Sequence, residues 1–302
     1  MQTPPLSTWL LLLLLGMIWG GSFPANALAL EGFGPFTIAA LRIAIGAAAV
    51  MLLARVMGVG LPSRQTATGR RIWLHALGLA LFANAVPFTL LGWGQQHVTS
   101  GFAGITMAGV PLLVLPLAHF LVPGERLSLR KTAGFALGFG GVVLLIGPAA
   151  LSAGGADALP RLACIGAAAC YACGSIVTRR APAGPMLSFS AAALLLAATV
   201  MIPTALTIEG VPDAPGLRAA LAAVYLGLLP TAVATLILVH VIQTAGPSFL
   251  SLVNYQVPLW AVLMGFLFLD EQVPAEALGA LGLILAGLVL AQGGRRGRRA
   301  AV

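Results

Sequence analysis

Apolar residues fill ten stretches of this chain, each close to 20 residues long, and polar residues gather in the short gaps between them. A helix needs about 20 apolar residues to cross a bilayer, and its backbone must form its hydrogen bonds within the segment. The pattern therefore predicts an all-α, polytopic membrane protein. Its ten transmembrane helices are expected at residues 9–29, 35–57, 72–92, 101–122, 132–150, 161–178, 185–207, 217–240, 248–269 and 273–292.

The first stretch also has features of a secretory signal peptide, because small residues at 25–29 follow the leucine-rich run at 10–15. No Lys or Arg precedes that run, and the apolar stretch continues past Pro24 for a full bilayer length. We therefore expect a first span that is retained.

Charged residues divide between alternate gaps. One set of gaps contains 13 of the 16 Lys and Arg: Arg55, Arg64, Arg70, Arg71, Arg126, Arg130, Lys131, Arg179, Arg180, Arg295, Arg296, Arg298 and Arg299. The other set contains 7 of the 8 acids: Glu31, Asp157, Glu209, Asp213, Asp270, Glu271 and Glu276. Positively charged loops remain cytoplasmic. The pattern predicts a multi-pass protein of the bacterial inner membrane with both termini in the cytoplasm.

Composition supports this interpretation and changes the meaning of the charge. Hydrophobic residues make up 59% of the chain and charged residues 8%, whereas about a quarter of a soluble domain is charged. The net charge of +8 therefore reflects topology signals and does not indicate nucleic-acid binding. Membrane lipid and a small-molecule substrate are the expected partners. The oligomeric state stays open, and a monomer is compatible with the sequence.

The two halves of the chain resemble each other. Gln96 is followed 15 residues later by Pro111, and Gln243 is followed 15 residues later by Pro258. Three further pairs of short segments match in the same order: 32–35 with 182–185, 125–127 with 271–273, and 141–143 with 287–289. The sequence predicts a first five-helix repeat at residues 1–150 and a second at 151–302, which ends in a basic cytoplasmic tail.

Five spans per repeat is an odd number, so the second copy must cross the membrane in the opposite direction. Inverted repeats of this kind build transporters that bind substrate near the bilayer midplane, between the two halves. The sequence pattern alone therefore indicates a transporter.

Several segments also resemble a known family. They are Trp19-Gly20-Gly21-Ser22-Phe23, Ala40-Leu41-Arg42, the segment from Pro111 to Leu127 with its Gly-Glu-Arg-Leu end, and the echo of that segment from Pro258 to Val273. Together they resemble the EamA family of the drug/metabolite transporter superfamily, over nearly the whole chain. The resemblance implies ten helices in two inverted repeats and export of a small metabolite. Within that family the chain is most similar to bacterial exporters of amino acids, including aromatic ones.

Arg42 is the only formal charge well inside a predicted span. An ionisable group at that depth is costly and indicates a functional site, and a guanidinium would attract a substrate carboxylate. The alternative is a structural role, in which Arg42 extends outward or binds carbonyl groups at a helix end.

Polar and aromatic residues on four other spans are the further candidates for the substrate pathway. Trp19 and Ser22 share one face of span 1 with Asn26, and a polar face is expected to avoid lipid. The remaining candidates lie on spans 3, 6 and 9: Asn84, Phe88, Tyr171, Ser251, Asn254, Tyr255 and Gln256. Packing within the bundle is the alternative role for each of them.

Gates and hinges are expected at bulky apolar residues and at prolines inside spans. Phe23 and Met107 are the candidates for gates. The candidates for hinges, where a proline removes a helical hydrogen bond, are Pro87, Pro111, Pro230 and Pro258.

The sequence offers little support for catalysis. The four histidines lie near predicted helix ends, and no metal-ligand spacing is present among them and the three cysteines. We expect no cofactor and no metal, and we predict that the protein is not an enzyme. An intramembrane lipid-modifying enzyme would need a cluster of acid, His or Cys at one depth, and a channel would need continuous polar stripes on several helices.

The predicted function is an inner-membrane exporter of amino acids, with aromatic or bulky apolar ones favoured, working by alternating access. No Asp or Glu lies at the middle of a span, so facilitated transport is expected. A proton-coupled exporter of a nucleoside, sugar or drug is the alternative, with His97 or His240 as a proton carrier.

Overall fold

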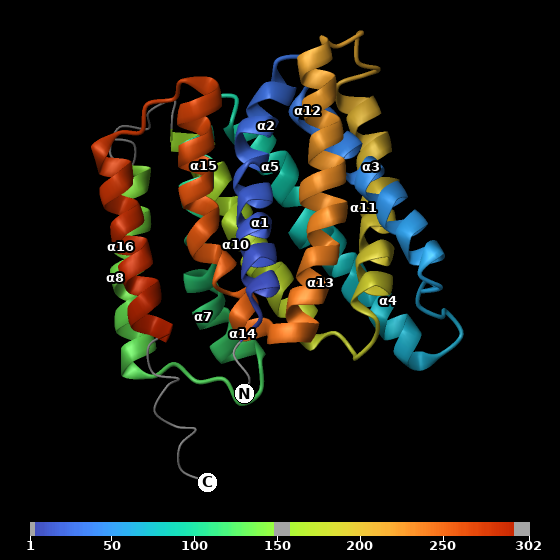
Figure 1. The fold of residues 1–302 in the computed structure, drawn as a ribbon, viewed down its shortest axis with the longest axis horizontal. Helices are drawn as coiled ribbons and strands as arrows, with labels where there is room; N and C mark the ends of the chain where they lie inside the picture. Colours follow the sequence, from blue (N-terminus) through green and yellow to red (C-terminus); the bar gives the residue numbers. More distant parts are fainter. Residues whose placement is uncertain (1–3, 148–157, 293–302) are drawn as a thin grey trace.

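A computed structural model describes residues 4–147 and 158–292 of the chain as a helical bundle (Figure 1). The helices of the first half are α1 (Leu6–Gly20), α2 (Ser22–Leu30), α3 (Pro35–Val56), α4 (Ala67–Ala80), α5 (Val86–Gly94), α6 (Ser100–Met107), α7 (Val110–Leu121) and α8 (Leu129–Ile146). Those of the second half are α10 (Ala158–Arg180), α11 (Met186–Ile208), α12 (Leu217–Gly227), α13 (Ala234–Ala245), α14 (Pro247–Leu250), α15 (Val253–Leu269) and α16 (Ala275–Gln292).

The predicted spans are confirmed as helices. In the described part of the chain, nine continuous helical segments are long and apolar enough to cross a membrane. Helix α15, at 17 residues, corresponds to the predicted ninth span and is the shortest of the ten; 17 residues lies at the lower end of the bilayer-spanning range. The protein is therefore an all-α, multi-pass membrane protein. The predicted boundary between the repeats, near residue 150, lies outside the described residues.

Two spans contain a short π-helical turn at matching positions. The first, η1 (Leu81–Ala85), joins α4 to α5, and the second, η2 (Leu228–Val233), joins α12 to α13. Their starts are separated by the same spacing that relates Gln96 to Gln243. Single π-helical turns inside α-helices occur frequently at functional sites. The two turns therefore lie at positions that the predicted repeat relates, and the repeat itself stays a prediction.

The charge division corresponds to the two ends of the bundle. Segments 57–66, 122–128 and 181–185, with the helix ends beside them, carry the basic residues and lie at the lower end in Figure 1. Segments 31–34, 209–216 and 270–274 carry the acids and lie at the upper end. We call these the basic end and the acidic end. Asp157 and the arginines at 295–299 lie outside the described residues, and the cytoplasmic location of the termini stays a prediction.

Glycine residues bring α8 and α16 into backbone contact. A Cβ atom added to Gly134 would lie 2.5 Å from the carbonyl oxygen of Gly287, and one added to Gly141 would lie 2.8 Å from that of Ala280. Small residues allow this close approach between helices in lipid. By contrast, a Cβ atom added to Gly279, in the same helix as Gly287, would meet nothing within 4 Å.

Two carboxylates of the second half cap helices of the first half at the acidic end. Glu209 accepts hydrogen bonds from the backbone N–H groups of Phe36 and Thr37, at 3.1 and 2.8 Å. Glu271 accepts from the N–H groups of Ser100 and Gly101, at 2.8 and 3.1 Å, and from the Ser100 hydroxyl at 2.8 Å. A carboxylate at a helix N-terminus satisfies orphan N–H groups and complements the helix dipole.

The cap on α6 yields a stability prediction. Replacing Glu271 by alanine should lower the free energy of unfolding by about 2 kcal/mol, because it removes charge-assisted hydrogen bonds to two backbone N–H groups. Thermal unfolding of the purified protein measures this change. Glu276→Ala is the matched control, since Glu276 is exposed in the first turn of α16. Equal losses in the two variants would contradict the capping role.

Candidate functional site

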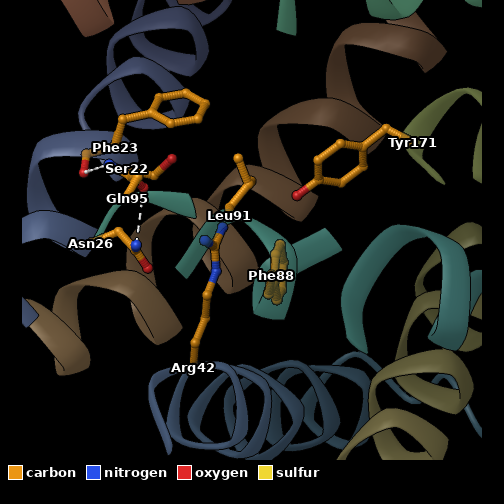
Figure 2. Close-up of a pocket in the computed structure, with 8 residues that line it drawn as sticks. All are labelled: Ser22, Phe23, Asn26, Arg42, Phe88, Leu91, Gln95 and Tyr171. Carbon is orange, nitrogen blue, oxygen red and sulfur yellow. Dashed lines mark hydrogen bonds between the residues drawn. The ribbon is translucent and has the colours of Figure 1, made fainter. Parts of the chain in front are cut away.

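A small cavity lies inside the bundle, between α2, α3, α5 and α10. Its volume is about 30 Å³, which leaves room for a water molecule or two. The lining side chains, shown in Figure 2, are Ser22, Phe23, Asn26, Arg42, Phe88, Leu91, Gln95 and Tyr171. Three of the four contributing helices belong to the first half, and α10 belongs to the second.

Arg42 is the charged group of the cavity. It is the eighth residue of α3, roughly 10 Å along the helix axis from its start at the acidic end. Its Nε donates a hydrogen bond of 3.4 Å to the Thr231 hydroxyl in η2, and its guanidinium carbon lies 3.8 Å from the centre of the Phe88 ring. Within the described residues, no carboxylate lies within ion-pair distance of Arg42.

This arrangement leaves the Arg42 guanidinium able to donate further hydrogen bonds. The two terminal nitrogens of Arg42 donate no hydrogen bond to any described residue, and they point toward Leu91 in Figure 2. A desolvated guanidinium presents its donors in a planar fork that matches a carboxylate. The site can therefore bind a carboxylate without first breaking an ion pair.

Aromatic side chains form one wall of the cavity. The rings of Phe88 and Tyr171 are tilted against each other, with centroids 6.5 Å apart. The Tyr171 side chain comes from α10, and its hydroxyl points toward the cavity in Figure 2. Phe88 attracts Arg42 through its ring face. The cavity thus combines a cation with an apolar, aromatic surface.

A pair of amides forms the opposite wall. The Asn26 Nδ2 donates to the Gln95 Oε1 at 2.9 Å, and the Gln95 Nε2 donates to the Phe23 carbonyl at 3.0 Å. Both amide side chains are buried. These bonds connect α2 to the end of α5 and fix the orientation of each amide. The Asn26 carbonyl oxygen remains directed to the cavity side in Figure 2.

Gln95 was absent from the predicted site. The sequence placed the end of span 3 at residue 92, which left Gln95 in a gap, whereas α5 continues to Gly94 with Gln95 at its C-cap. A signal was available, because Gln95 follows Phe88 by seven residues and Leu91 by four. These intervals place all three on one helical face.

Asn84 and Trp19 were predicted to line the substrate pathway, but they do not line the cavity. Their side chains make hydrogen bonds at the π-helical turns. Asn84 lies in η1, and its side-chain amide donates to the Leu79 carbonyl of α4, at 3.1 Å. In η2, the Thr231 hydroxyl makes the equivalent bond to the Leu226 carbonyl at 3.0 Å. The Trp19 indole donates to the Pro230 carbonyl at 3.2 Å. These bonds satisfy carbonyl groups in and around the turns.

The span 9 candidates lie apart from the cavity. Ser251 is in the turn before α15, and its carbonyl accepts a hydrogen bond from the Asn254 amide at 3.1 Å. Tyr255 packs against the apolar cluster of α6, α7, α8 and α16. Gln256 faces α1, where a Cβ added to Gly16 would lie 2.8 Å from its Oε1. A substrate pathway along span 9 stays a prediction.

The candidate gates lie in the buried interior, and the candidate hinges lie at separate positions within the spans. Phe23 lines the cavity, and Met107 belongs to the same buried apolar cluster as Phe23. The hinge candidates all lie within spans: Pro87 follows η1, Pro111 begins α7 after a break in span 4, Pro230 lies in η2, and Pro258 lies within α15. Three of the four prolines thus coincide with an interruption of regular helix.

Fold and site together define a class of protein. A multi-pass helical bundle encloses a site with a fixed cation, an aromatic wall and hydrogen-bonding amides. The EamA-like transporter family model matches residues 6–147 and again 160–292. The chain therefore belongs to the EamA-like transporter family and is a membrane transporter. The two matches fall one in each half of the chain.

Individual relatives are similar over nearly the full length. The chain is 28% identical to the "Probable terminal-alkyne amino-acid exporter" of Streptantibioticus cattleyicolor, covering 97% of this chain and 95% of that protein. It is 29% identical to the "Uncharacterized inner membrane transporter YedA" of Escherichia coli, covering 91% and 87%. It is 26% identical to "Protein PecM" of Dickeya dadantii, covering 91% and 89%.

A solved structure shares the fold. One described only as a "Crystal structure of protein" aligns with a TM-score of 0.68 and 24% identity, covering 95% of this chain and 97% of that one. At this level of identity the likeness concerns the fold alone. It supports the fold of the chain.

Proposed function

We propose that this transporter exports amino acids across the bacterial inner membrane, with aromatic or bulky apolar side chains preferred. The observation that supports this most strongly is Arg42, a membrane-embedded cation without a carboxylate partner in the described residues, beside an aromatic wall. The similarity to a probable amino-acid exporter points the same way. Export over import rests on that relative and on the resemblance to exporters.

The chemistry of the cavity fits a zwitterion with an apolar side chain. Arg42 offers donors to the substrate carboxylate, while the Asn26 carbonyl oxygen and the Tyr171 hydroxyl offer acceptors to an ammonium group. Phe88 and Tyr171 offer ring faces and edges to an aromatic or branched side chain. A doubly charged phosphate fits less well, because a single cation would leave one of its charges uncompensated.

Transport requires the cavity to enlarge. Pockets that bind small molecules usually have volumes of about 300–1,000 Å³, and this cavity has about 30 Å³. An amino acid can therefore enter only after the helices around it separate. We propose that the two halves rock about the cavity and expose Arg42 to one side at a time, with Phe23 and Met107 closing the path and the π-helical turns bending.

Coupling to an ion is not required by the site. Of the described residues that line the cavity, none is Asp or Glu, whereas ion-driven carriers usually keep a buried carboxylate. We propose facilitated transport down the substrate gradient. Proton coupling through a histidine is the competing mechanism.

Uptake into proteoliposomes tests this proposal. Labelled phenylalanine, tryptophan, leucine, threonine and a nucleoside would be offered with and without an imposed pH gradient. We expect saturable amino-acid uptake without a gradient. Uptake only with the gradient would contradict facilitated transport and support proton coupling. Uptake of the nucleoside alone would contradict the proposed substrate class.

A further inference from the structure

A second, larger pocket lies at the basic end of the bundle. It is formed by the end of α7, the segment 122–128 that follows it, and the end of α10, and its volume is about 380 Å³. The side chains that determine its chemistry are His119, Phe120, Leu121, Glu125, Arg126 and Arg180. The first five belong to the first half of the chain and Arg180 to the second, so the pocket joins the two halves.

Two arginines of this pocket are available to bind an anionic ligand. Glu125, its one acid, already pairs with Lys131 at 3.3 Å and with Arg179. The Arg179 guanidinium beside it holds the pKa of Glu125 below its usual value, so the carboxylate stays ionised at neutral pH. Across the described residues, neither Arg126 nor Arg180 forms an ion pair. The pocket therefore has excess positive charge.

The pocket also has an apolar side that faces away from the bundle. Phe120 is 79% exposed and Leu121 is 43% exposed, both in the last turn of a membrane-spanning segment. A soluble ligand would gain little from these side chains, whereas lipid acyl chains would cover them. Cations next to exposed apolar residues at the end of a span match the two parts of a phospholipid.

We propose that this pocket binds the headgroup of an anionic membrane phospholipid. Arg126 and Arg180 would contact the phosphate from opposite halves of the protein, and the acyl chains would lie along Phe120 and Leu121. A lipid bound there would strengthen the connection between the halves that the Glu125–Arg179 pair already makes. The inference rests on the pocket and its charges and is independent of which substrate the central cavity carries.

Lipid binding to the intact protein tests the proposal. Purified protein would be titrated with phosphatidylglycerol and, separately, with phosphatidylcholine, and bound lipid would be counted by native mass spectrometry alongside thermal unfolding. We expect phosphatidylglycerol to bind and raise the unfolding temperature, and phosphatidylcholine to bind at least tenfold more weakly. Equal binding of the two lipids would overturn the proposal.

Paired substitutions locate the binding site. Arg126→Gln with Arg180→Gln should weaken phosphatidylglycerol binding by about tenfold or more, since each cation next to an anionic headgroup contributes to the attraction. The matched control is Arg55→Gln with Arg71→Gln, two exposed arginines outside the pocket. Equal weakening by the two pairs would show a diffuse surface effect and overturn the proposal. If the double variant does not fold, Arg126→Gln and Arg180→Gln are measured singly, and unchanged binding in both would likewise overturn it.

A soluble phosphate compound is the other ligand that could present a phosphate group to the two arginines. Soluble glycerol 3-phosphate at millimolar concentration serves as the probe. We expect it to compete poorly with phosphatidylglycerol, because it lacks the acyl chains that cover Phe120 and Leu121. Complete displacement of the lipid by the soluble phosphate would overturn the assignment to membrane lipid.

Discussion

Replacing Arg42 by alanine is expected to reduce saturable amino-acid uptake by this transporter by about 30-fold or more. Arg42 is the cation of the central cavity, and it lies in a desolvated position against Phe88 and Thr231. Removing one partner of a buried charge pair costs about 2–5 kcal/mol, and here the pair is Arg42 with the substrate carboxylate. The lower value corresponds to about a 30-fold loss in the rate of uptake at subsaturating substrate. Uptake of phenylalanine into proteoliposomes, at equal amounts of inserted protein, measures the effect.

Arg161→Ala is the matched control for that substitution. Arg161 lies at the start of a predicted span, in the first turns of α10. It donates to the Ile146 carbonyl at 2.8 Å and lies beside the aromatic ring of Phe102. It is not among the residues that line the cavity. We expect this variant to keep most of its uptake. Equal losses in both variants would indicate a general need for structural arginines and would contradict carboxylate binding at Arg42.

Replacing Gly287 by valine is expected to lower the stability of the folded protein substantially. A Cβ atom at this position would lie 2.5 Å from the Gly134 carbonyl oxygen and 2.6 Å from the Gly138 nitrogen. These are backbone atoms, so relief requires α8 and α16 to separate. Overpacking typically costs about 1–3 kcal/mol and sometimes more, and we expect the unfolding temperature to fall by roughly 5 °C or more.

Gly282 provides the control on the same helix. A Cβ atom added to Gly282 meets nothing within 4 Å, so Gly282→Val should leave the unfolding temperature nearly unchanged. Valine has the same intrinsic helix propensity in both variants, and the comparison therefore isolates the close approach between α8 and α16. Similar unfolding temperatures for the two variants would contradict this account of the contact.

The transmembrane helices were predictable because their signal is local. A span is defined by the length and hydrophobicity of one segment, and segments such as 35–57 and 217–240 reappear as helices with small shifts at their ends. The transporter family was also accessible, because several short motifs recur in both halves. Neither inference requires knowledge of how one helix packs against another.

The site was predictable only in part, because it depends on how the helices are rotated against each other. Arg42, Ser22, Phe88 and Tyr171, four of the predicted substrate-binding residues, line the cavity, as does the candidate gate residue Phe23. Their roles in binding and gating stay predictions. Periodicity places Asn254 and Tyr255 in a helical span, but it does not say which neighbouring helix covers either side chain. The glycines show the same limit, since Gly287 and Gly282 lie in one helix and only Gly287 meets a neighbour.

The prolines predicted interruptions without predicting their form. Pro87 and Pro230 indicated bends in the corresponding spans, and the structure has π-helical turns at both places. The side chains that stabilise these turns, Asn84 and Thr231, occupy matching positions in the two halves. A polar residue at each of these positions could be seen in the sequence, but its bond to a carbonyl five residues earlier could not.

Counterflow tests the central claim most directly, because it distinguishes an amino-acid carrier from a channel or an enzyme. Proteoliposomes would be loaded with excess unlabelled phenylalanine, diluted into a trace of labelled phenylalanine, and sampled over time. A carrier that alternates access predicts a transient accumulation of label inside above its external concentration. No accumulation of label from correctly folded protein, with any of the amino acids tested, would contradict the proposal that this transporter carries amino acids by alternating access.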